Sequence, residues 1–383
     1  MQKIKLRNRK PYPRAAYGHP WVFKSEIEEL LPSEYDGQGV ICLDRRGEII
    51  GSGIYNSQSN IVWRRYSFVE EEFDRLFLEY ALTRAAAGRK GESCCRLVWS
   101  EADNLPGLVV DRYNSRLVVQ AFTKAMDIRI KDICSILVEK FNPEAVLIRN
   151  DAPSRKHEGL LPNIYDFHGN SGQEETVEIE GMKYCLSFKE GNKTGFYIDQ
   201  RKEHLYIGAL SAGRRVLDGF CSQGAFSLNC ARSGAVSVTG VDISSANISR
   251  AVKNARLNGL KAEFIEYNMF DYFSDNKDKK FDMIILDPPS FARNRKALEG
   301  ALRGYKELNL RAFKMLSTGG ILATYSCSQS IDIRIFEKTV AQAAHDAGRR
   351  VRILRRAFQP EDHPVILGIP ETEYLKGLVL VAG

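Results

Sequence analysis

Short apolar segments alternate with segments of helical periodicity from about residue 185 to the end of the chain. Five apolar segments suit buried parallel strands: residues 216–218, 237–242, 263–267, 283–287 and 320–325. Helical segments lie between them, notably residues 245–257 and 304–316. This alternation predicts a doubly wound α/β domain, in which a ligand binds beyond the carboxyl ends of the strands.

The N-terminal part of the chain follows another pattern. Strand-like segments at residues 37–44, 48–55 and 61–66 are separated by glycines and polar turns, which predicts a small β-barrel.

The middle of the chain predicts a small α+β module. A helix is expected at residues 70–87, followed by strands at 95–99, 107–112 and 116–122 and a helix at 126–141. Further strands are expected at 145–149 and 176–180, and residues 161–172, rich in Gly, Asn and Pro, are expected to form a loop. We describe the module as strand–strand–helix–strand–strand and place the domains at residues 1–72, 73–184 and 185–383.

Charge is unevenly distributed in this chain of net charge +7. Residues 1–25 contain no acidic side chain, and their basic residues are Lys3, Lys5, Arg7, Arg9, Lys10, Arg14 and Lys24. Aromatic side chains such as Trp21 are interleaved with them, and nucleic-acid bases stack on such rings. We expect Lys3, Lys5, Arg7 and Trp21 to bind RNA; a solvated basic terminus is the alternative.

Two classes of protein are disfavoured. No apolar run approaches the roughly 18–20 residues that cross a bilayer, and the N-terminus has no signal-like apolar core, so a cytoplasmic location without a membrane partner is expected. The eight cysteines form no C-x-x-C pair and no zinc spacing with histidine, so no metal site is expected. Most of them should be small buried side chains, but one can be a nucleophile.

The expected ligand is a nucleoside cofactor. The first strand of the α/β domain ends at Asp218-Gly219, and a turn of small residues runs on to Gly224. The second strand ends at Asp242, whose carboxylate can accept both hydroxyls of a ribose; a helix N-cap is the alternative for this residue. The turn lacks the full G-x-G-x-x-G pattern of dinucleotide sites. Together with the Asp-Pro-Pro sequence at Asp287, it favours S-adenosylmethionine.

Further cofactor contacts are expected near the strand ends. Ile243 follows Asp242, and Asn268 or the main chain of Met269 can reach the adenine edge. The segment before the first strand supplies an apolar wall from Phe196, while Gln200 or Arg201 can hold the methionine carboxylate. An ordinary charged helix start is the alternative for this segment.

Cys327 ends the last predicted strand and suggests one chemistry. Cytosine C5 is a poor nucleophile until a thiolate adds at C6, which lets C5 accept a methyl group. Asp287 can share a proton with the base during that addition. Phe291 can stack on a flipped base beside Pro288, and Arg293 can hold a phosphate. A buried core cysteine is the alternative for Cys327.

These motifs together closely resemble the RlmI-type large-subunit ribosomal RNA methyltransferases. The resemblance rests on seven segments: Gly18-His-Pro-Trp-Val-Phe23, Glu101-Ala-Asp-Asn-Leu-Pro-Gly-Leu108, Lys193-Thr-Gly-Phe-Tyr-Ile-Asp-Gln-Arg201, Asp287-Pro-Pro-Ser-Phe291, Tyr325-Ser-Cys-Ser328, Asp362-His-Pro-Val365 and Tyr374-Leu-Lys-Gly377. It implies an N-terminal PUA domain, a central α+β domain and a Rossmann-like methyltransferase domain that makes 5-methylcytosine in 23S ribosomal RNA. It implies Cys327 as nucleophile and Asp287 as partner of the base, with ribosomal RNA or a large-subunit precursor as partner. A homodimer is compatible with it.

Two departures and two rival functions stay open. The cofactor turn reads Phe220-Cys-Ser-Gln-Gly224, where a Ser-Tyr-Thr-Gly type is common in the family, and the Asp-Pro-Pro loop has no second cysteine, so another base must remove the C5 proton. One rival is an RNA amino-nitrogen methyltransferase acting on guanine or adenine, for which Cys327 is dispensable. The other is a non-enzymatic RNA-binding assembly factor. Asp362 and His363 either face the site or form a structural turn.

Overall fold

A computed structural model of the chain describes residues 1–8, 13–89, 91–191, 193–291 and 298–383. The chain forms two compact units. The first contains Met1–Glu175, Leu186–Ile198 and Glu361–Thr372, and the second contains Thr176–Cys185, Asp199–Pro360 and Glu373–Gly383. The division into three domains at residues 72/73 and 184/185 stays a prediction.

The first unit begins with the predicted barrel. Its five strands are β1 (Gln2–Lys5), β2 (Trp21–Phe23), β3 (Gly39–Leu43), β4 (Ile49–Tyr55) and β5 (Ile61–Ser67), in the order β1-β3-β4-β5-β2. An antiparallel bridge between Leu6 and Ile27 joins the end of β1 to the chain after β2, so the sheet closes on itself. Its interior contains apolar side chains such as Val22, Val40 and Trp63.

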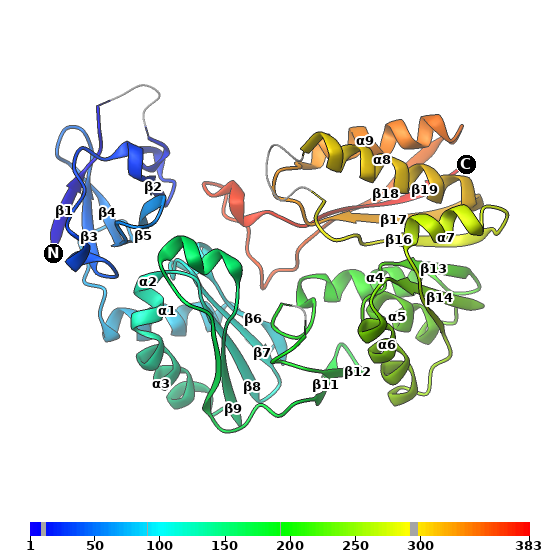
Figure 1. Ribbon diagram of the computed structural model, residues 1–383, viewed down its shortest axis with the longest axis horizontal. Helices are drawn as coiled ribbons and strands as arrows, with labels where there is room; N and C mark the ends of the chain where they lie inside the picture. Colours follow the sequence, from blue (N-terminus) through cyan, green and yellow to red (C-terminus); the bar gives the residue numbers. More distant parts are fainter. Residues whose placement is uncertain (9–12, 90, 192, 292–297) are drawn as a thin grey trace. The chain divides into compact units, whose positions relative to one another are not determined.

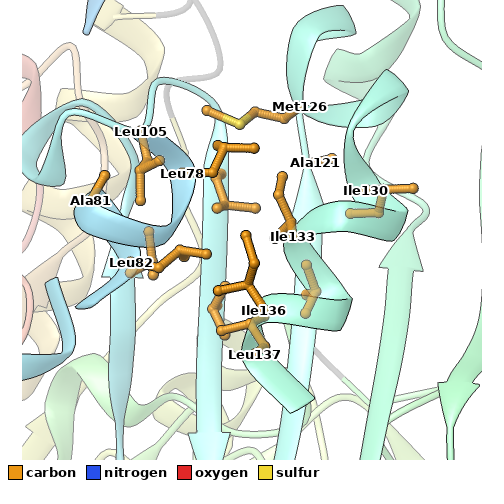
Figure 2. Packing of buried hydrophobic residues seen from close by; sticks show 14 of the residues in the cluster. Leu78, Ala81, Leu82, Leu105, Ala121, Met126, Ile130, Ile133, Ile136 and Leu137 are labelled. Atoms are coloured by element: carbon orange, nitrogen blue, oxygen red, sulfur yellow. The ribbon is translucent and has the colours of Figure 1, made fainter. Parts of the chain in front are cut away.

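A second sheet follows in the same unit (Figure 1). Its strands are β6 (Cys94–Trp99), β7 (Leu108–Tyr113), β8 (Arg116–Ala121), β9 (Ala145–Asn150) and β10 (Asn163–His168), in the order β10-β9-β8-β7-β6. Helices α1 (Arg75–Ala87), α2 (Lys124–Ile128) and α3 (Ile130–Phe141) accompany it. Figure 2 shows Leu78 and Leu82 of α1 beside Ile133 and Leu137 of α3 in the apolar core. This burial holds both helices on the sheet.

The structure differs from the prediction for this module in three details. Residues 161–172 are not all loop, because β10 lies within them and pairs antiparallel with β9. Its residues alternate poorly in polarity and are mostly exposed, so no apolar periodicity marks the strand. The strand expected at 176–180 is β11 (Glu175–Ile179), which pairs with β12 (Met182–Leu186) in a separate two-stranded sheet. The helix expected at 126–141 is divided into α2 and α3.

The second unit is built on a seven-stranded mixed sheet. Its strands are β13 (Arg215–Gly219), β14 (Ser237–Asp242), β15 (Glu263–Glu266), β16 (Phe281–Leu286), β17 (Leu316–Ser326), β18 (Val351–Phe358) and β19 (Lys376–Ala382). Their order is β15-β14-β13-β16-β17-β19-β18, with β13 to β17 parallel to one another. The predicted α/β domain is therefore confirmed. Strands β18 and β19, which had no counterpart among the predicted elements, are antiparallel additions at one edge.

Helices cover both faces of this sheet (Figure 1). One face packs against α7 (Met269–Asp275), α8 (Leu298–Met315) and α9 (Ile333–Asp346), and the other against α4 (Arg201–Leu210), α5 (Ala225–Arg232) and α6 (Ser245–Leu257). Successive strand residues alternate between the two cores: Ile284 and Leu286 enter the first, whereas Met283 and Ile285 enter the second. Residues 283–286 of β16 are therefore all apolar, because both faces of the sheet are buried here. Within the described residues, no helix has the length and apolar composition needed to cross a bilayer.

Candidate active site

The glycine turn, Asp242, Asp287 and Cys327 lie where the parallel strands of the second unit end. Gly219, the last residue of β13, lies opposite Val241 of β14 and Leu286 of β16. Asp242 and Asp287 therefore each lie one residue beyond the same level of the sheet. Leu286 is in turn opposite Thr324 of β17, three residues before Cys327. This places the glycine turn, both carboxylates and the cysteine at one edge of the second unit, as expected for an open α/β sheet.

The turn after β13 has unusual backbone geometry. Phe220 and Ser222 have φ values of 65° and 48°, and Gly224, just before α5, has a φ of 85°. Left-handed conformations are rare for residues with a side chain and concentrate at functional sites. At Gly219, an added Cβ would come within 2.9 Å of Met269 Sδ. The turn therefore requires glycine both for its conformation and for its close packing.

Asp242 accepts hydrogen bonds from main-chain groups on both sides of the cofactor edge. The Ser222 amide donates to Oδ2 and the Ser244 amide to Oδ1, both at 2.9 Å, and Asn247 Nδ2 donates to Oδ1 at 3.3 Å. The N-cap of α6 is Ser244, so Asp242 is not the helix cap that was its alternative role. A carboxylate has about four acceptor positions, which leaves capacity for a ribose hydroxyl.

Asp218 is fully buried at the end of β13. Ser227 donates its main-chain N–H at 3.0 Å and its Oγ–H at 2.6 Å to Oδ2, whereas Oδ1 has no hydrogen-bond partner in the described part of the chain. Burial raises the pKa of the Asp218 carboxyl to about 7, and the hydrogen bonds from Ser227 oppose that rise. A buried acceptor without a partner at a ligand-binding edge fits a cofactor that donates a hydrogen bond there.

The residues expected beside the adenine differ in their environments. Ile243 is 67% exposed, whereas Met269 is buried. The Asn268 side chain caps α7 by accepting from the amides of Phe270 at 2.9 Å and Asp271 at 3.4 Å. The amide oxygen of Asn268 therefore has a structural partner, and its contact with adenine stays a prediction.

The segment before β13 links the cofactor edge to the Asp-Pro-Pro loop. Gln200 Nε2 donates to Asp287 Oδ2 at 2.7 Å. Arg201 is buried, and its Nε lies 3.4 Å from Glu180 Oε1. Phe196 is buried in the first unit, where its carbonyl accepts from Tyr113 at 3.5 Å. The roles of these three side chains toward the cofactor stay predictions.

Cys327 differs from the other cysteines of the chain. The other seven are buried, and Cys327 is half-buried directly after β17. The residues on either side of it hold its loop: Ser326 Oγ lies 3.0 Å from Tyr305 Oη, and Ser328 Oγ lies 3.3 Å from the same atom. Ser328 Oγ also lies 2.9 Å from Ser290 Oγ of the Asp-Pro-Pro loop. Hydrogen bonds thus connect the cysteine loop with the loop that contains Asp287.

The substrate side of this edge is partly described. Pro288 is buried, and the half-buried Phe291 ring packs against Tyr305 with centroids 4.8 Å apart. Phe291 is thus supported by α8, and its stacking on a base stays a prediction. Arg293 lies outside the described residues.

In the barrel, the basic residues of β1 and of the segment just after it share one face. Lys3 and Arg7 are exposed and Lys5 is half-buried, whereas the intervening Ile4 and Leu6 point into the interior. Lys5 Nζ lies 3.8 Å from Glu28.

Trp21 is more constrained than its sequence context suggested. Its Nε1–H donates to Glu101 at 2.8 Å, and the Arg64 guanidinium lies 5.3 Å from its ring centroid. These intrachain contacts fix the ring, and stacking of RNA on it stays a prediction.

Sequence reasoning missed three residues that support Cys327: Tyr305, Ser290 and Lys376. Lys376 Nζ donates at 2.7 Å to the carbonyls of Ser328 and Ile331. Tyr374-Leu-Lys-Gly377 was recognised only as part of a resembling segment, and only the antiparallel β17–β19 ladder brings it beside Cys327.

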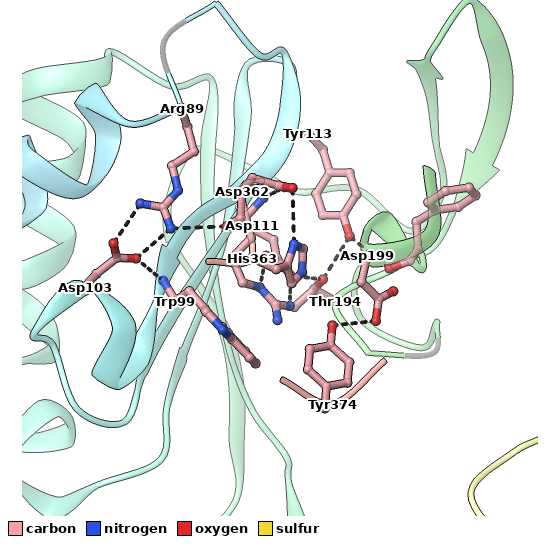
Figure 3. A network of polar contacts seen from close by, with 12 residues as sticks. Arg89, Trp99, Asp103, Asp111, Tyr113, Thr194, Asp199, Asp362, His363 and Tyr374 are labelled. Atoms are coloured by element: carbon pink, nitrogen blue, oxygen red, sulfur yellow. Dashed lines mark hydrogen bonds and ion pairs between the residues drawn. The ribbon is translucent and has the colours of Figure 1, made fainter. Parts of the chain in front are cut away.

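Asp362 and His363 belong to a buried polar network of the first unit (Figure 3). The Asp362 carboxylate accepts from the Arg96 amide at 2.7 Å, and its carbonyl accepts from Arg89 Nη2 at 3.1 Å. Arg89 also pairs with both oxygens of Asp103, at 2.7 and 2.8 Å. These contacts give Asp362 a structural role, one of its two alternatives.

Comparison with protein families agrees with this arrangement. The family of S-adenosylmethionine-dependent methyltransferases matches residues 168–366, and that of PUA-like domains matches residues 4–68. The chain therefore belongs to the S-adenosylmethionine-dependent methyltransferases.

Two curated relatives match nearly the whole chain and have the same name. The protein named Ribosomal RNA large subunit methyltransferase I from Shewanella amazonensis is 38% identical over 374 residues, 94% of each chain. Its namesake from Tolumonas auensis is 38% identical over 378 residues, 95% of each chain.

Two solved structures share the fold over the full length of both chains. SMU.776, a methyltransferase in complex with SAH, has a TM-score of 0.86 at 19% identity. A SAM-dependent methyltransferase from Streptococcus mutans has a TM-score of 0.85 at 18% identity.

Proposed function

We propose that this enzyme methylates C5 of a cytosine in large-subunit ribosomal RNA, with Cys327 as the nucleophile. The observation that carries the proposal is the hydrogen-bonded connection of Ser290 with Ser328, which holds the one half-buried cysteine beside the Asp-Pro-Pro loop. The names of the curated relatives support ribosomal RNA as the substrate.

The residues at the strand ends fit S-adenosylmethionine. Asp242 has acceptor capacity for the ribose, Ile243 offers an exposed apolar surface for the adenine, and the open acceptor of Asp218 suits a donor of the methionine part. The absence of a side chain at Gly219 lets Met269 and Leu286 pack against the main chain at the end of β13. When bound, the cofactor supplies a methyl group on a positively charged sulfur.

The side chains of this enzyme activate the base. Cys327 Sγ, as thiolate, forms a bond to C6, and the electron pair of the C5–C6 double bond becomes available at C5. Asp287, held by Gln200, hydrogen-bonds or shares a proton with N3 as charge develops there. After methyl transfer a base removes the C5 proton, the C5–C6 double bond reforms, and the Sγ–C6 bond breaks to release the thiolate.

RNA recognition is assigned to two places. The outer face of β1 and of the two residues after it, with Lys3, Lys5 and Arg7, suits a phosphate backbone, because cations along an extended chain can neutralise successive phosphates. Phe291, supported by Tyr305, suits stacking on the target base. A ribosomal RNA substrate implies a cytoplasmic enzyme, and a homodimer is a further part of the proposal that sedimentation would test.

The decisive experiment measures methyl transfer from labelled S-adenosylmethionine to ribosomal RNA from cells that lack the protein. We expect the wild type to produce 5-methylcytidine, identified by mass spectrometry, and Cys327→Ala to produce none. Cys134→Ala, which changes a buried cysteine of the first unit, is the control and should retain activity.

The same experiment separates the rival functions. A methylated purine, or full activity in Cys327→Ala, would establish the amino-nitrogen methyltransferase. Absence of cofactor binding and of methyl transfer in the wild type would favour an assembly factor.

A further inference from the structure

Lys376 is a buried cation next to the cysteine loop. It begins β19 and lies opposite Ser326 in the antiparallel ladder with β17, one residue from Cys327. Lys376 is 5% exposed. Its Nζ donates at 2.7 Å to the carbonyl oxygens of Ser328 and Ile331, so the ammonium lies within the loop that follows the nucleophile.

The position of this ammonium is electrostatically costly. Among the residues that the structure describes, its two hydrogen-bond acceptors are neutral carbonyls and no carboxylate forms an ion pair with it. A buried charge without a close counter-ion is disfavoured. Burial lowers the pKa of Lys376 to about 8, while Cys327, Glu373 and Asp332 act in the opposite direction. Glu373 and Asp332 are exposed, so solvent screens them, whereas Cys327 is half-buried. A thiolate is therefore the partner that the ammonium can stabilise most directly.

The other groups that act at this place oppose a thiolate or are neutral. Asp287, beyond β16, brings a negative charge, and Tyr305 of α8 interacts with both Cys327 and Asp287. Burial raises the pKa of Tyr305, so its hydroxyl stays neutral and donates or accepts hydrogen bonds among Ser326 and Ser328. A carboxylate near a thiol disfavours its ionisation, so the Lys376 ammonium acts on Cys327 in the direction opposite to that of Asp287.

We propose that Lys376 is a positioning residue for the methyl transfer reaction, whose ammonium favours the thiolate form of Cys327 and fixes the loop that carries it. The inference rests on the proposed function, since it gives Cys327 a nucleophilic role. Lys376 comes from the antiparallel strand β19, whereas the other residues of the proposed reaction, Asp287 and Cys327, follow parallel strands. A purely structural lysine would pin the loop through its two carbonyls without changing the ionisation of the thiol.

Thiol alkylation distinguishes these two roles. The rate of iodoacetamide reaction is measured from pH 6 to pH 10 on the full chain, without RNA or cofactor. The thiolate is the reacting species, and the other seven cysteines are buried, so the fast phase reports Cys327 and should disappear in Cys327→Ala. Lys376→Met removes charge and donors, Lys376→Gln keeps a neutral donor, and Lys376→Arg keeps the charge.

We expect the midpoint of the alkylation profile to rise by about one pH unit in the Met and Gln variants, which lowers the rate at pH 7 about tenfold. Lys376→Arg should restore most of the rate, and thermal unfolding should show that each variant is folded. Folded Met and Gln variants with the wild-type profile would overturn the proposal. So would an Arg variant as slow as Lys376→Met.

This measurement is independent of the proposed reaction. Methyl transfer by Cys327→Ala would refute the nucleophilic role of Cys327. The alkylation profile would still show whether Lys376 favours the thiolate form of Cys327. Failure of the proposed function and failure of this inference are thus separate results.

Discussion

Ser290 Oγ and Ser328 Oγ lie 2.9 Å apart and join two loops that come from different strands of the same sheet. Ser290 follows β16 in the Asp-Pro-Pro loop, and Ser328 follows Cys327 after β17. The hydroxyl of Tyr305 in α8 forms hydrogen bonds with the hydroxyls of Ser328 and Ser326. The distance between the carboxylate loop and the thiol loop is therefore set by hydroxyl groups that take no part in the proposed chemistry.

Ser328→Ala should lower kcat about five- to tenfold, because loss of a hydrogen bond of about 1 kcal/mol would let the two loops separate. Binding of S-adenosylhomocysteine, measured by calorimetry, should not change. The half-buried Ser330 in the same loop supplies the control Ser330→Ala. Equal kcat values for the two variants would contradict the positioning role of Ser328.

Asp242→Asn should weaken S-adenosylhomocysteine binding at least tenfold. The amide cannot accept from both the Ser222 and the Ser244 main chain, and hydrogen bonds to a charged group contribute about 1.5–3 kcal/mol. Titration calorimetry provides the measurement. Glu266→Gln changes the exposed acid opposite Asp242 in the β14–β15 ladder and should bind normally. An unchanged affinity in Asp242→Asn would remove this residue from the cofactor site.

Gly224→Ala and Gly234→Ala distinguish two effects on the free energy of unfolding: strain of a left-handed backbone and crowding of an added Cβ. Both glycines have left-handed backbone, with φ of 85° and 87°. An added Cβ at Gly234 meets nothing within 4 Å, whereas at Gly224 it would lie 3.1 Å from the Phe264 ring and 3.2 Å from Ala251 Cβ. Gly234→Ala should cost about 1–2 kcal/mol in urea unfolding, and Gly224→Ala about 1 kcal/mol more. Equal losses would show that packing at Gly224 is not limiting.

The free energy of unfolding of the cofactor-free protein should depend on pH because of Asp218. Burial raises the pKa of Asp218 from 3.8 to about 7 in the folded state. The folded state therefore binds more protons between those values, and this group's contribution to stability is lost as the pH rises toward 7. Asp218→Asn should gain stability relative to the wild type between pH 5 and pH 8, as followed by urea unfolding. The exposed Asp278→Asn should show no such trend, and a pH-independent difference for Asp218→Asn would refute the assignment.

Asp103→Ala should destabilise the first unit by about 3–5 kcal/mol, because it leaves the buried Arg89 guanidinium without its carboxylate. Glu139→Ala removes an ion pair with Arg75 whose side chains are 61% and 44% exposed. That loss should stay within about 1 kcal/mol. Denaturant unfolding of both variants tests the comparison, and a small effect at Asp103 would mean that Asp362 compensates for it.

The extent to which the sequence predicted the fold differs between elements. Strand β16 and residues 320–325 of β17 have apolar runs, because they are buried on both faces. All five strands from β13 to β17 were expected close to their positions. Strand β10, the edge strand β18 and its neighbour β19 were missed. β18 is exposed along most of its length, so apolar periodicity does not mark it.

The chemical groups of the candidate site could be read from the amino-acid sequence alone. Asp218, Gly219 and Asp242 end a recognisable strand, and Asp287 and Cys327 directly follow one. Parallel strands bring their carboxyl ends to one edge. The residues that support these groups could be identified only from the three-dimensional arrangement of the chain. Gln200 on Asp287, Ser290 on Ser328 and Lys376 on the cysteine loop are contacts between residues 38 to 87 positions apart. Such contacts depend on strand order and register, which local periodicity does not encode.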